Sequence, residues 1–108
     1  MEDFEKARLR RKLDDYDLTD FQKDVLRAAL EIPKGEVRTY KQIAEAVGHP
    51  KAYRAVGTAL KKNPLAPDIP CHRVIKSNGE LGNYSGVGGT KRKMELLSME
   101  GNEPHFAA

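Results

Sequence analysis

Tryptophan is absent from this sequence, and cysteine occurs only once, at Cys71. A single cysteine excludes an internal disulfide and a metal site built from several cysteines; it also indicates a reducing compartment, the cytoplasm or a eukaryotic nucleus. No apolar run approaches the roughly 18 residues that cross a bilayer. The first residues, Met1-Glu2-Asp3-Phe4, are acidic where a secretory signal would be basic and then apolar. The sequence therefore predicts neither a membrane protein nor a secreted one.

A strong excess of one charge is also missing, because the formal net charge is only +3. The distribution is nevertheless uneven. Residues 34–63 hold seven Lys or Arg and two Asp or Glu, a local charge of +5, whereas residues 1–33 are net −2 and residues 64–108 are neutral. A basic segment of this kind is expected of a protein that binds a phosphate backbone, and it is also compatible with a solvated basic helix face.

The beginning of the chain predicts one weak element and one firm helix. Residues 4–17 set charged side chains around few apolar ones, which indicates a marginal surface helix or a frayed arm. Thr19 can cap the next helix, because Gln22 lies at the capping-box position and an apolar stripe follows until Pro33. We therefore divide the chain into a short N-terminal arm, residues 1–18, and one domain, residues 19–108.

Two short helices joined by a tight turn are predicted in the basic segment. The first begins after Thr39 and ends at Gly48, and the second begins at His49-Pro50, because proline is favoured at the first helical position. The pair fits a helix-turn-helix, a pattern that also occurs in small α-domains that do not bind DNA. The second helix presents a polar, mostly basic outer face made of Lys51, Arg54, Thr58, Lys61 and Lys62.

After Pro64 the sequence predicts a short hairpin and a glycine-rich loop. Val74-Ile75 would form one strand, Asn78-Gly79 the turn, and Leu81 the return strand. The glycines of residues 82–89 lack the Lys-Ser/Thr ending of a phosphate loop.

A last helix is expected from Thr90, as its cap, to Gly101, with Met94, Leu97 and Met99 on its inner face. The predicted fold class is therefore α/β, mainly α. It is a small, winged-helix-like helix-turn-helix domain with a short hairpin and an active-site loop.

Cys71 stands in an unusual setting, between Pro70 and the pair His72-Arg73. Adjacent positive charges lower the pKa of a thiol and raise its thiolate fraction. Neighbours in an extended segment point to opposite faces, so adjacency alone does not establish contact. From these residues alone Cys71 is either a reactive thiol or an inert packing residue.

A longer set of motifs surrounds this cysteine and resembles a known family. Arg54-Ala55-Val56-Gly57 and Asn63-Pro64 precede Pro70-Cys71-His72-Arg73-Val74, and Gly82-Asn83-Tyr84-Ser85-Gly86 follows it. In this order and spacing the motifs resemble those of the O6-alkylguanine-DNA alkyltransferases, also called methylated-DNA–protein-cysteine methyltransferases, from about Thr19 to Gly101. The resemblance implies irreversible transfer of an alkyl group from O6 of a damaged guanine to the protein, with the base flipped out of the duplex. It also implies a monomer that binds double-stranded DNA containing O6-alkylguanine through the minor groove, without a cofactor.

The resemblance assigns a role to several single residues. Cys71 matches the alkyl acceptor, His72 the base that takes its proton through a bound water, and Glu100 the carboxylate that orients this histidine. Tyr40 matches the tyrosine that assists at the guanine and helps rotate the nucleotide, and Arg54 the finger that fills the gap left by the flipped base. Glu100 could otherwise be a surface carboxylate, and Tyr40 a core aromatic at the start of its helix.

Further positions resemble the substrate pocket of that family, where backbone and hydroxyl donors would bind the guanine edge. Asn63 resembles a hinge asparagine that ties the helix-turn-helix to the active-site loop. The residues that resemble the pocket wall are Val74, Tyr84, Ser85 and Gly86. These wall residues could also be ordinary hairpin and turn positions.

Three features depart from the family's usual pattern. The family usually carries a substantial N-terminal domain, sometimes with a structural metal, where this chain has only about 18 residues, so no metal site is expected. Tyr53 is bulkier than the small residue expected before the finger arginine, and the loop Gly86-Val87-Gly88-Gly89 is about two residues longer than usual. These departures bear on DNA affinity and on the size of the pocket.

Two other functions remain as alternatives. An alkyltransferase-like damage sensor binds alkylated DNA without transfer, but such proteins lack the cysteine that Cys71 supplies here. A transcription regulator with a helix-turn-helix would leave Cys71 and the glycine-rich loop unexplained. The sequence therefore favours a DNA repair protein that transfers an alkyl group once to its own cysteine.

Overall fold

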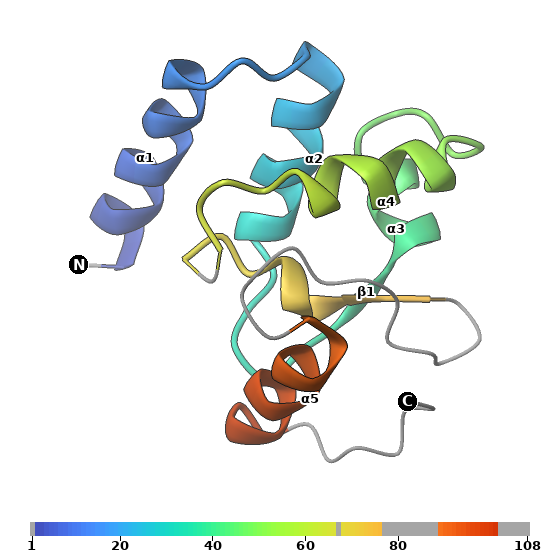
Figure 1. Cartoon of the computed structure of the whole chain (residues 1–108). Coiled ribbons are helices and arrows are strands. Elements are labelled where there is room, and N and C mark those ends of the chain that lie inside the picture. The colour runs from blue at the N-terminus through green and yellow to red at the C-terminus, as the bar shows by residue number, and fades with distance from the viewer. Residues whose placement is uncertain (1, 67, 77–88, 102–108) are drawn as a thin grey trace.

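The computed structural model describes residues 2–66, 68–76 and 89–101 (Figure 1). In this part of the chain every helix is too short or too polar to span a bilayer. The mainly helical α/β class predicted from the sequence is confirmed. The elements, in chain order, are α1 (Glu2–Lys12), the 3-10 turn η1 (Leu13–Asp15), α2 (Asp20–Leu30), β1 (Arg38–Thr39), α3 (Tyr40–Ala46), α4 (Tyr53–Lys61), the 3-10 turn η2 (Cys71–Arg73), β2 (Val74–Ile75) and α5 (Gly89–Met99).

Helix α2 begins and packs as the sequence predicts. Thr19 Oγ1 accepts a hydrogen bond from the Gln22 backbone N–H at 3.1 Å, and the Gln22 side chain accepts one from the Thr19 N–H at 3.0 Å. This capping box satisfies donors that the first turn of a helix cannot pair internally. Val25 and Ala29 of the predicted stripe are fully buried, and α2 packs against both α3 and α4. It is therefore the central helix of the main core.

Helices α3 and α4 form the predicted helix-turn-helix, with one correction at the start of α4. Thr39 caps α3 through a second capping box, and Gly48 ends the turn of α3 with a φ of +83°, a conformation that glycine adopts without strain. The prediction that α4 begins at His49-Pro50 was wrong, because this segment forms a turn in which the Ala52 N–H donates to the His49 carbonyl at 2.9 Å. The helix starts only at Tyr53. Val56, Ala59 and Leu60 are buried on its inner face, whereas Ala55 is exposed.

Of the two alternatives predicted for the start of the chain, a marginal surface helix or a frayed arm, the structure shows the helix, α1, and packs it against the core. Leu9 and Leu13 are 4% and 0% exposed and join the main hydrophobic core. Arg10 and Lys6 pair with Glu31 at the end of α2. Two buried leucines give too weak a sequence pattern to reveal this contact, because the charged residues around them dominate the local composition.

The two strands pair in parallel, with Arg38 opposite Val74 and Thr39 opposite Ile75. The predicted strand at Val74-Ile75 is confirmed, but the partner that the structure describes is β1 and not a hairpin return. Turn signals favour a local hairpin, whereas this pairing joins segments far apart in the sequence. The predicted turn at Asn78-Gly79 and the return strand at Leu81 lie outside the described residues.

Helix α5 lies on the opposite side of the sheet from α2, α3 and α4 (Figure 1). Its Leu97 packs with Ile75 of β2 in a second small cluster, with Met94 partly buried beside it. Two expectations were wrong: the helix begins at Gly89, which places Thr90 inside it, and Met99 is 72% exposed because the helix ends there. Gly101, with a φ of +90°, turns the chain away as predicted.

Candidate functional site

Cys71 and His72 lie in the 3-10 turn η2, directly before β2. The Cys71 N–H donates to the Ile69 carbonyl at 2.8 Å, which folds the chain tightly around Pro70. Cys71 and His72 are 3% and 2% exposed. The turn therefore holds a thiol and an imidazole inside the protein, where an ordinary surface cysteine would face water.

Glu100 meets His72 at the end of α5. The Glu100 Oε2 atom lies 3.0 Å from His72 Nε2. Arg73 donates two hydrogen bonds to the same carboxylate, from Nε to Oε1 at 2.9 Å and from one Nη to Oε2 at 2.7 Å. The three side chains come together from η2 and α5, which are far apart in the sequence. An ordinary surface carboxylate would not be hydrogen-bonded to two such side chains, so this alternative does not fit Glu100.

The charges of this cluster fix the protonation states at neutral pH. Burial lowers the pKa of His72, the hydrogen bond and charge of Glu100 oppose this, and the charges of Arg73 and Lys93 lower it further. Burial by itself would raise the pKa of Glu100, but hydrogen bonds from Arg73 and His72 outweigh it and lower the pKa. His72 is therefore neutral and Glu100 ionised, the arrangement in which an imidazole can accept a proton and a carboxylate can orient it.

Lys93 is a buried residue that sequence reasoning missed. It is 0% exposed, its Nζ donates to the Val74 carbonyl at 2.6 Å, and the same nitrogen lies 5.8 Å from the centre of the Tyr40 ring. Burial lowers the pKa of Lys93 to about 8, and the nearby charge of Cys71 opposes this shift. A cation that remains beside a thiol favours its thiolate form.

The signal for Lys93 was present in the helix periodicity. Lys93, Leu96, Leu97 and Glu100 follow the spacing i, i+3, i+4 and i+7, which places them on one face of α5. Leu96 and Leu97 are buried, so this face is the inner one. The sequence analysis considered only Met94, Leu97 and Met99 for the inner face and so did not identify Lys93.

Asn63 links the end of α4 to the segment before Cys71. Its side-chain amide donates to the Ile69 carbonyl at 2.9 Å, and its side-chain oxygen accepts from the Leu65 N–H at 2.9 Å. The residue is 6% exposed, so both groups are satisfied inside the protein. It has the bridging geometry that a hinge between the helix-turn-helix and the η2 turn requires.

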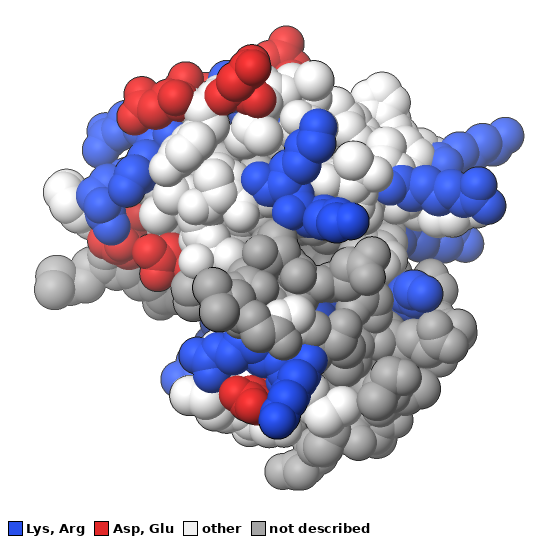
Figure 2. Space-filling model, viewed as in Figure 1, with Lys and Arg blue, Asp and Glu red and all other residues white. Residues whose placement is uncertain are grey.

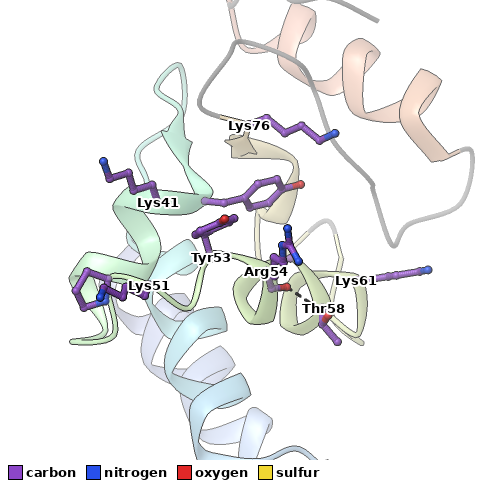
Figure 3. Close-up of a pocket in the computed structure, with 10 residues that line it drawn as sticks. Lys41, Lys51, Tyr53, Arg54, Thr58, Lys61 and Lys76 are labelled. Atoms are coloured by element: carbon purple, nitrogen blue, oxygen red, sulfur yellow. Dashed lines mark hydrogen bonds between the residues drawn. The ribbon is translucent and has the colours of Figure 1, made fainter.

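An open pocket of about 1000 Å³ lies at the outer side of α4 (Figure 3). Cys71 is not among the described residues that line it, whereas Tyr40 is, and the centre of its ring lies 5.8 Å from Lys93 Nζ of the buried cluster. On the face shown in Figure 2, Lys and Arg gather on the side where α3 and α4 lie. The pocket is lined by Tyr40, Lys41, Pro50, Lys51, Tyr53, Arg54, Gly57, Thr58, Lys61 and Lys76.

The predicted outer face of α4 therefore lies around this pocket with one exception. Lys51, Arg54, Thr58 and Lys61 line it, whereas Lys62 is exposed at the end of the helix and lies outside the lining. Thr58 Oγ1 donates to the Arg54 carbonyl within the helix at 3.3 Å. Sequence reasoning did not assign Lys41 and Lys76 to this surface.

The predicted pocket wall is only partly described. Val74 is fully buried and offers its backbone carbonyl to Lys93. Tyr84, Ser85 and Gly86 lie outside the described residues. Within the described ranges no group of three or more His, Cys, Asp or Glu side chains could hold a metal ion.

Comparison with known proteins gives both sequence and structural relatives. Residues 20–102 match a family model described as 6-O-methylguanine DNA methyltransferase, DNA binding domain. A methylated-DNA–protein-cysteine methyltransferase of Methanosarcina barkeri is 53% identical over 97 residues, which cover 84% of this chain and 60% of that protein. One of the same name from Mycobacterium leprae is 52% identical over 82 residues, which cover 76% and 48%. The chain thus spans only about half of the length of these curated relatives.

Two solved structures share the arrangement of elements. Mycobacterium tuberculosis OGT in complex with DNA superimposes with a TM-score of 0.74 at 48% identity, over 82% of this chain and 54% of that one. S. pombe Atl1 in complex with damaged DNA containing O6-carboxymethylguanine superimposes with a TM-score of 0.69 at 37% identity, over 80% of each chain. Both similarities extend over most of the chain described above.

Proposed function

Because the chain belongs to the 6-O-methylguanine DNA methyltransferase family, whose DNA-binding domain it matches over residues 20–102, we propose that it is a DNA repair alkyltransferase. An alkyl group moves from O6 of a damaged guanine to Cys71 and stays there. The observation that carries this proposal is the buried Cys71-His72 pair with Glu100 held 3.0 Å from the histidine. A merely structural cysteine would not need an oriented base beside it.

The transfer step follows from the chemistry of these groups. Cys71 gives its proton to His72, through a bound water as in the family, and Glu100 stabilises the imidazolium that forms. The Cys71 sulfur then attacks the alkyl carbon; the carbon–sulfur bond forms as the carbon–O6 bond breaks, and the electron pair of that bond stays on the guanine. The guanine takes up one proton in exchange, assisted by the Tyr40 hydroxyl.

The charge of Lys93 supports the thiolate in this step. Its Nζ is fixed by the Val74 carbonyl at 2.6 Å, within the electrostatic reach of Cys71. The product is a thioether, which has no carbonyl for water to attack and no good leaving group. The protein therefore reacts once and needs no cofactor.

DNA is bound as duplex by the basic face around α4. Arg54 enters the minor groove and fills the gap left by the flipped guanine, while Lys51, Thr58, Lys61 and Lys62 contact phosphates. The support is the position of Lys51, Arg54, Thr58 and Lys61 around one open pocket (Figure 3), the exposure of Lys62 at the end of the same helix, and the Lys and Arg side chains gathered on this side of the face shown in Figure 2. The protein acts as a monomer at the chromosome, in the cytoplasm or in a nucleus.

The guanine pocket is made by the segments that flank Cys71. Asn63 fixes the segment that leads into the η2 turn, and Val74 directly follows this turn in the sequence. Tyr84, Ser85 and Gly86, which match the pocket wall of the family, complete it with backbone and hydroxyl donors. The domain formed by residues 19–108 thus carries both the DNA interface and the reaction centre, with residues 1–18 as an addition to it.

Intact-mass analysis tests the proposal directly. The protein is incubated with a duplex oligonucleotide containing O6-methylguanine, and a gain of one methyl group, mapped to Cys71, is expected. The control is Cys71→Ser, which should bind the same duplex without gaining mass, because a serine hydroxyl ionises too weakly for this displacement. Binding without any gain in mass by the wild type would show a damage sensor instead. Sequence-specific binding without preference for the lesion would show a transcription regulator.

A further inference from the structure

We propose that Arg73 is a positioning residue of the reaction centre, which holds the Glu100 carboxylate in the orientation from which it contacts His72. The inference rests on the proposed function of Cys71 and His72 and adds a member to their site. The side-chain hydrogen bonds of Arg73 go to the Glu100 carboxylate and to the Ile32 carbonyl. Its effect on the transfer passes through Glu100.

The contacts of Arg73 form a clamp between two helices. Its Nε and one Nη donate to the two carboxylate oxygens of Glu100 at 2.9 and 2.7 Å, and its other Nη donates to the Ile32 carbonyl at 2.7 Å. Ile32 follows the end of α2, and Glu100 follows the end of α5. A planar guanidinium can serve these acceptors together, whereas a lysine ammonium acts as a point charge.

Glu100 needs such a clamp because of its place in the chain. It follows the last residue of α5, and Gly101 turns the backbone away with a φ of +90°. Helix ends fray readily, and a carboxylate there has many rotamers. Among the described residues, Arg73 and His72 are the hydrogen-bond partners of this carboxylate. Without Arg73, only the histidine that Glu100 is meant to orient would hold it.

Arg73 also sets the balance of charge around His72. The charged groups that act on the imidazole are Lys93 from α5, Glu100 just after α5, and Arg73 from η2, while Cys71 of η2 acts on Lys93. Glu100 favours protonated His72, while the cations of Arg73 and Lys93 oppose it. Because Arg73 is bonded to Glu100, it offsets part of the carboxylate's charge. The clamp thus orients the histidine without turning it into a permanent cation.

Two substitutions separate the geometric effect of Arg73 from its charge. Arg73→Lys keeps a cation but loses the fork, and Arg73→Met loses both. The rate of alkyl transfer is measured in single-turnover reactions with a free O6-alkylguanine base, so that DNA binding does not contribute. Arg73→Lys should slow transfer roughly tenfold or more, as misplacement of a catalytic group does, with no shift of the acidic limb of the pH profile. Arg73→Met should also move that limb to higher pH, since a cation that opposes protonation of His72 is gone.

A second pair of variants tests whether the effect passes through Glu100. In a Glu100→Gln background, Arg73→Lys should cause little further loss, because the clamp has no carboxylate to hold. Equal fold-losses in both backgrounds would overturn the proposal and leave Arg73 with a merely structural role. Arg92→Lys is the matched control, since Arg92 pairs with Glu95 on the exposed side of α5 and should react as the wild type does. Thermal melting of each variant checks that it is folded.

A readout that does not depend on transfer distinguishes this inference from the proposed function. The ring resonances of His72 are followed by NMR against pH, assigned by their loss in His72→Gln. An upward shift of the His72 titration in Arg73→Met, and none in Arg73→Lys, is expected even if the wild type fails to gain an alkyl group. An unchanged titration in Arg73→Met refutes the charge effect of Arg73 on His72, whatever the transfer assay shows.

Discussion

Replacing Lys93 by methionine should change how the stability of the protein depends on pH. Lys93 is fully buried, and burial lowers its pKa from 10.5 to about 8. Below about pH 8 both the folded and the unfolded protein carry the proton, and the folded protein bears the full cost of a buried charge. Between about pH 8 and 10.5 the folded protein loses the proton while the unfolded chain keeps it, so folding becomes more favourable as pH rises.

The size of this effect follows from the pKa difference. A lowering from 10.5 to about 8 corresponds to roughly 3 kcal/mol, at about 1.36 kcal/mol per unit. Lys93→Met removes this cost, but it also removes the hydrogen bond to the Val74 carbonyl, and the loss of a partner by a buried acceptor costs about 1–3 kcal/mol. The two proteins should therefore be similar in stability at pH 7. At pH 10.5 the wild type should be the more stable one.

The assay is urea unfolding, followed by circular dichroism, of both proteins from pH 7 to 10.5. The free energy of unfolding of the wild type should rise relative to Lys93→Met by about 3 kcal/mol across this range. Lys91→Met serves as the control, because Lys91 is exposed on the same helix and should show no such difference. Parallel curves for wild type and Lys93→Met would refute the reasoning. In a Cys71→Ser background the rise should begin at lower pH, because the charge of Cys71 holds the pKa of Lys93 up.

Three further predictions concern DNA, the first helix and the alkylated product. Arg54→Ala should slow transfer from duplex DNA more than transfer from a free O6-alkylguanine base; equal losses of rate on the duplex and on the free base would place Arg54 in the guanine pocket. The double variant Lys61→Ala, Lys62→Ala should reduce the salt dependence of duplex binding more than Arg54→Ala does. Leu13→Ala should lower the free energy of unfolding by about 2–5 kcal/mol in urea titrations, because this side chain is fully buried. A loss under about 0.5 kcal/mol would show that this segment is a frayed arm. Methylation of the buried Cys71 should lower stability by about 1–3 kcal/mol, seen as a drop of roughly 4–8 °C per kcal/mol in the melting temperature, and an unchanged melting curve would contradict tight packing there.

The helix starts and stops could be predicted because their signals are local. Thr19 and Thr39 each lie three residues before a glutamine, and both capping boxes are present. Gly48 and Gly101 both adopt the left-handed conformation expected after a helix. At Pro50 the same local reasoning failed: proline fits the first position of a helix, but it fits a turn equally well.

Contacts between distant segments could not be predicted in this way. The pairing of Arg38 with Val74, and the burial of Leu13 by α2 and its neighbours, depend on the packed core and leave little trace in the local pattern. For Cys71, His72 and Glu100 the ordered motifs carried the prediction, because the spacing of a single chain cannot show that Glu100 reaches His72. Arg73 was noted only as a charge next to a thiol, whereas it faces Glu100 and Ile32.

Burying charged groups in this small domain costs folding free energy, and this cost favours a functional interpretation of the site. Lys93 is fully buried and His72 nearly so, while Arg73 and Glu100 are 15% and 11% exposed at the side chain. Buried ion pairs often contribute less to stability than well-packed apolar side chains of similar size. A core selected for stability alone would place leucine or methionine at these positions. His72, Arg73 and Glu100 are hydrogen-bonded to one another, and Lys93 lies within electrostatic reach of both His72 and the buried Cys71. A proton acceptor, a carboxylate beside it and a fixed positive charge are useful for chemistry at such a thiol.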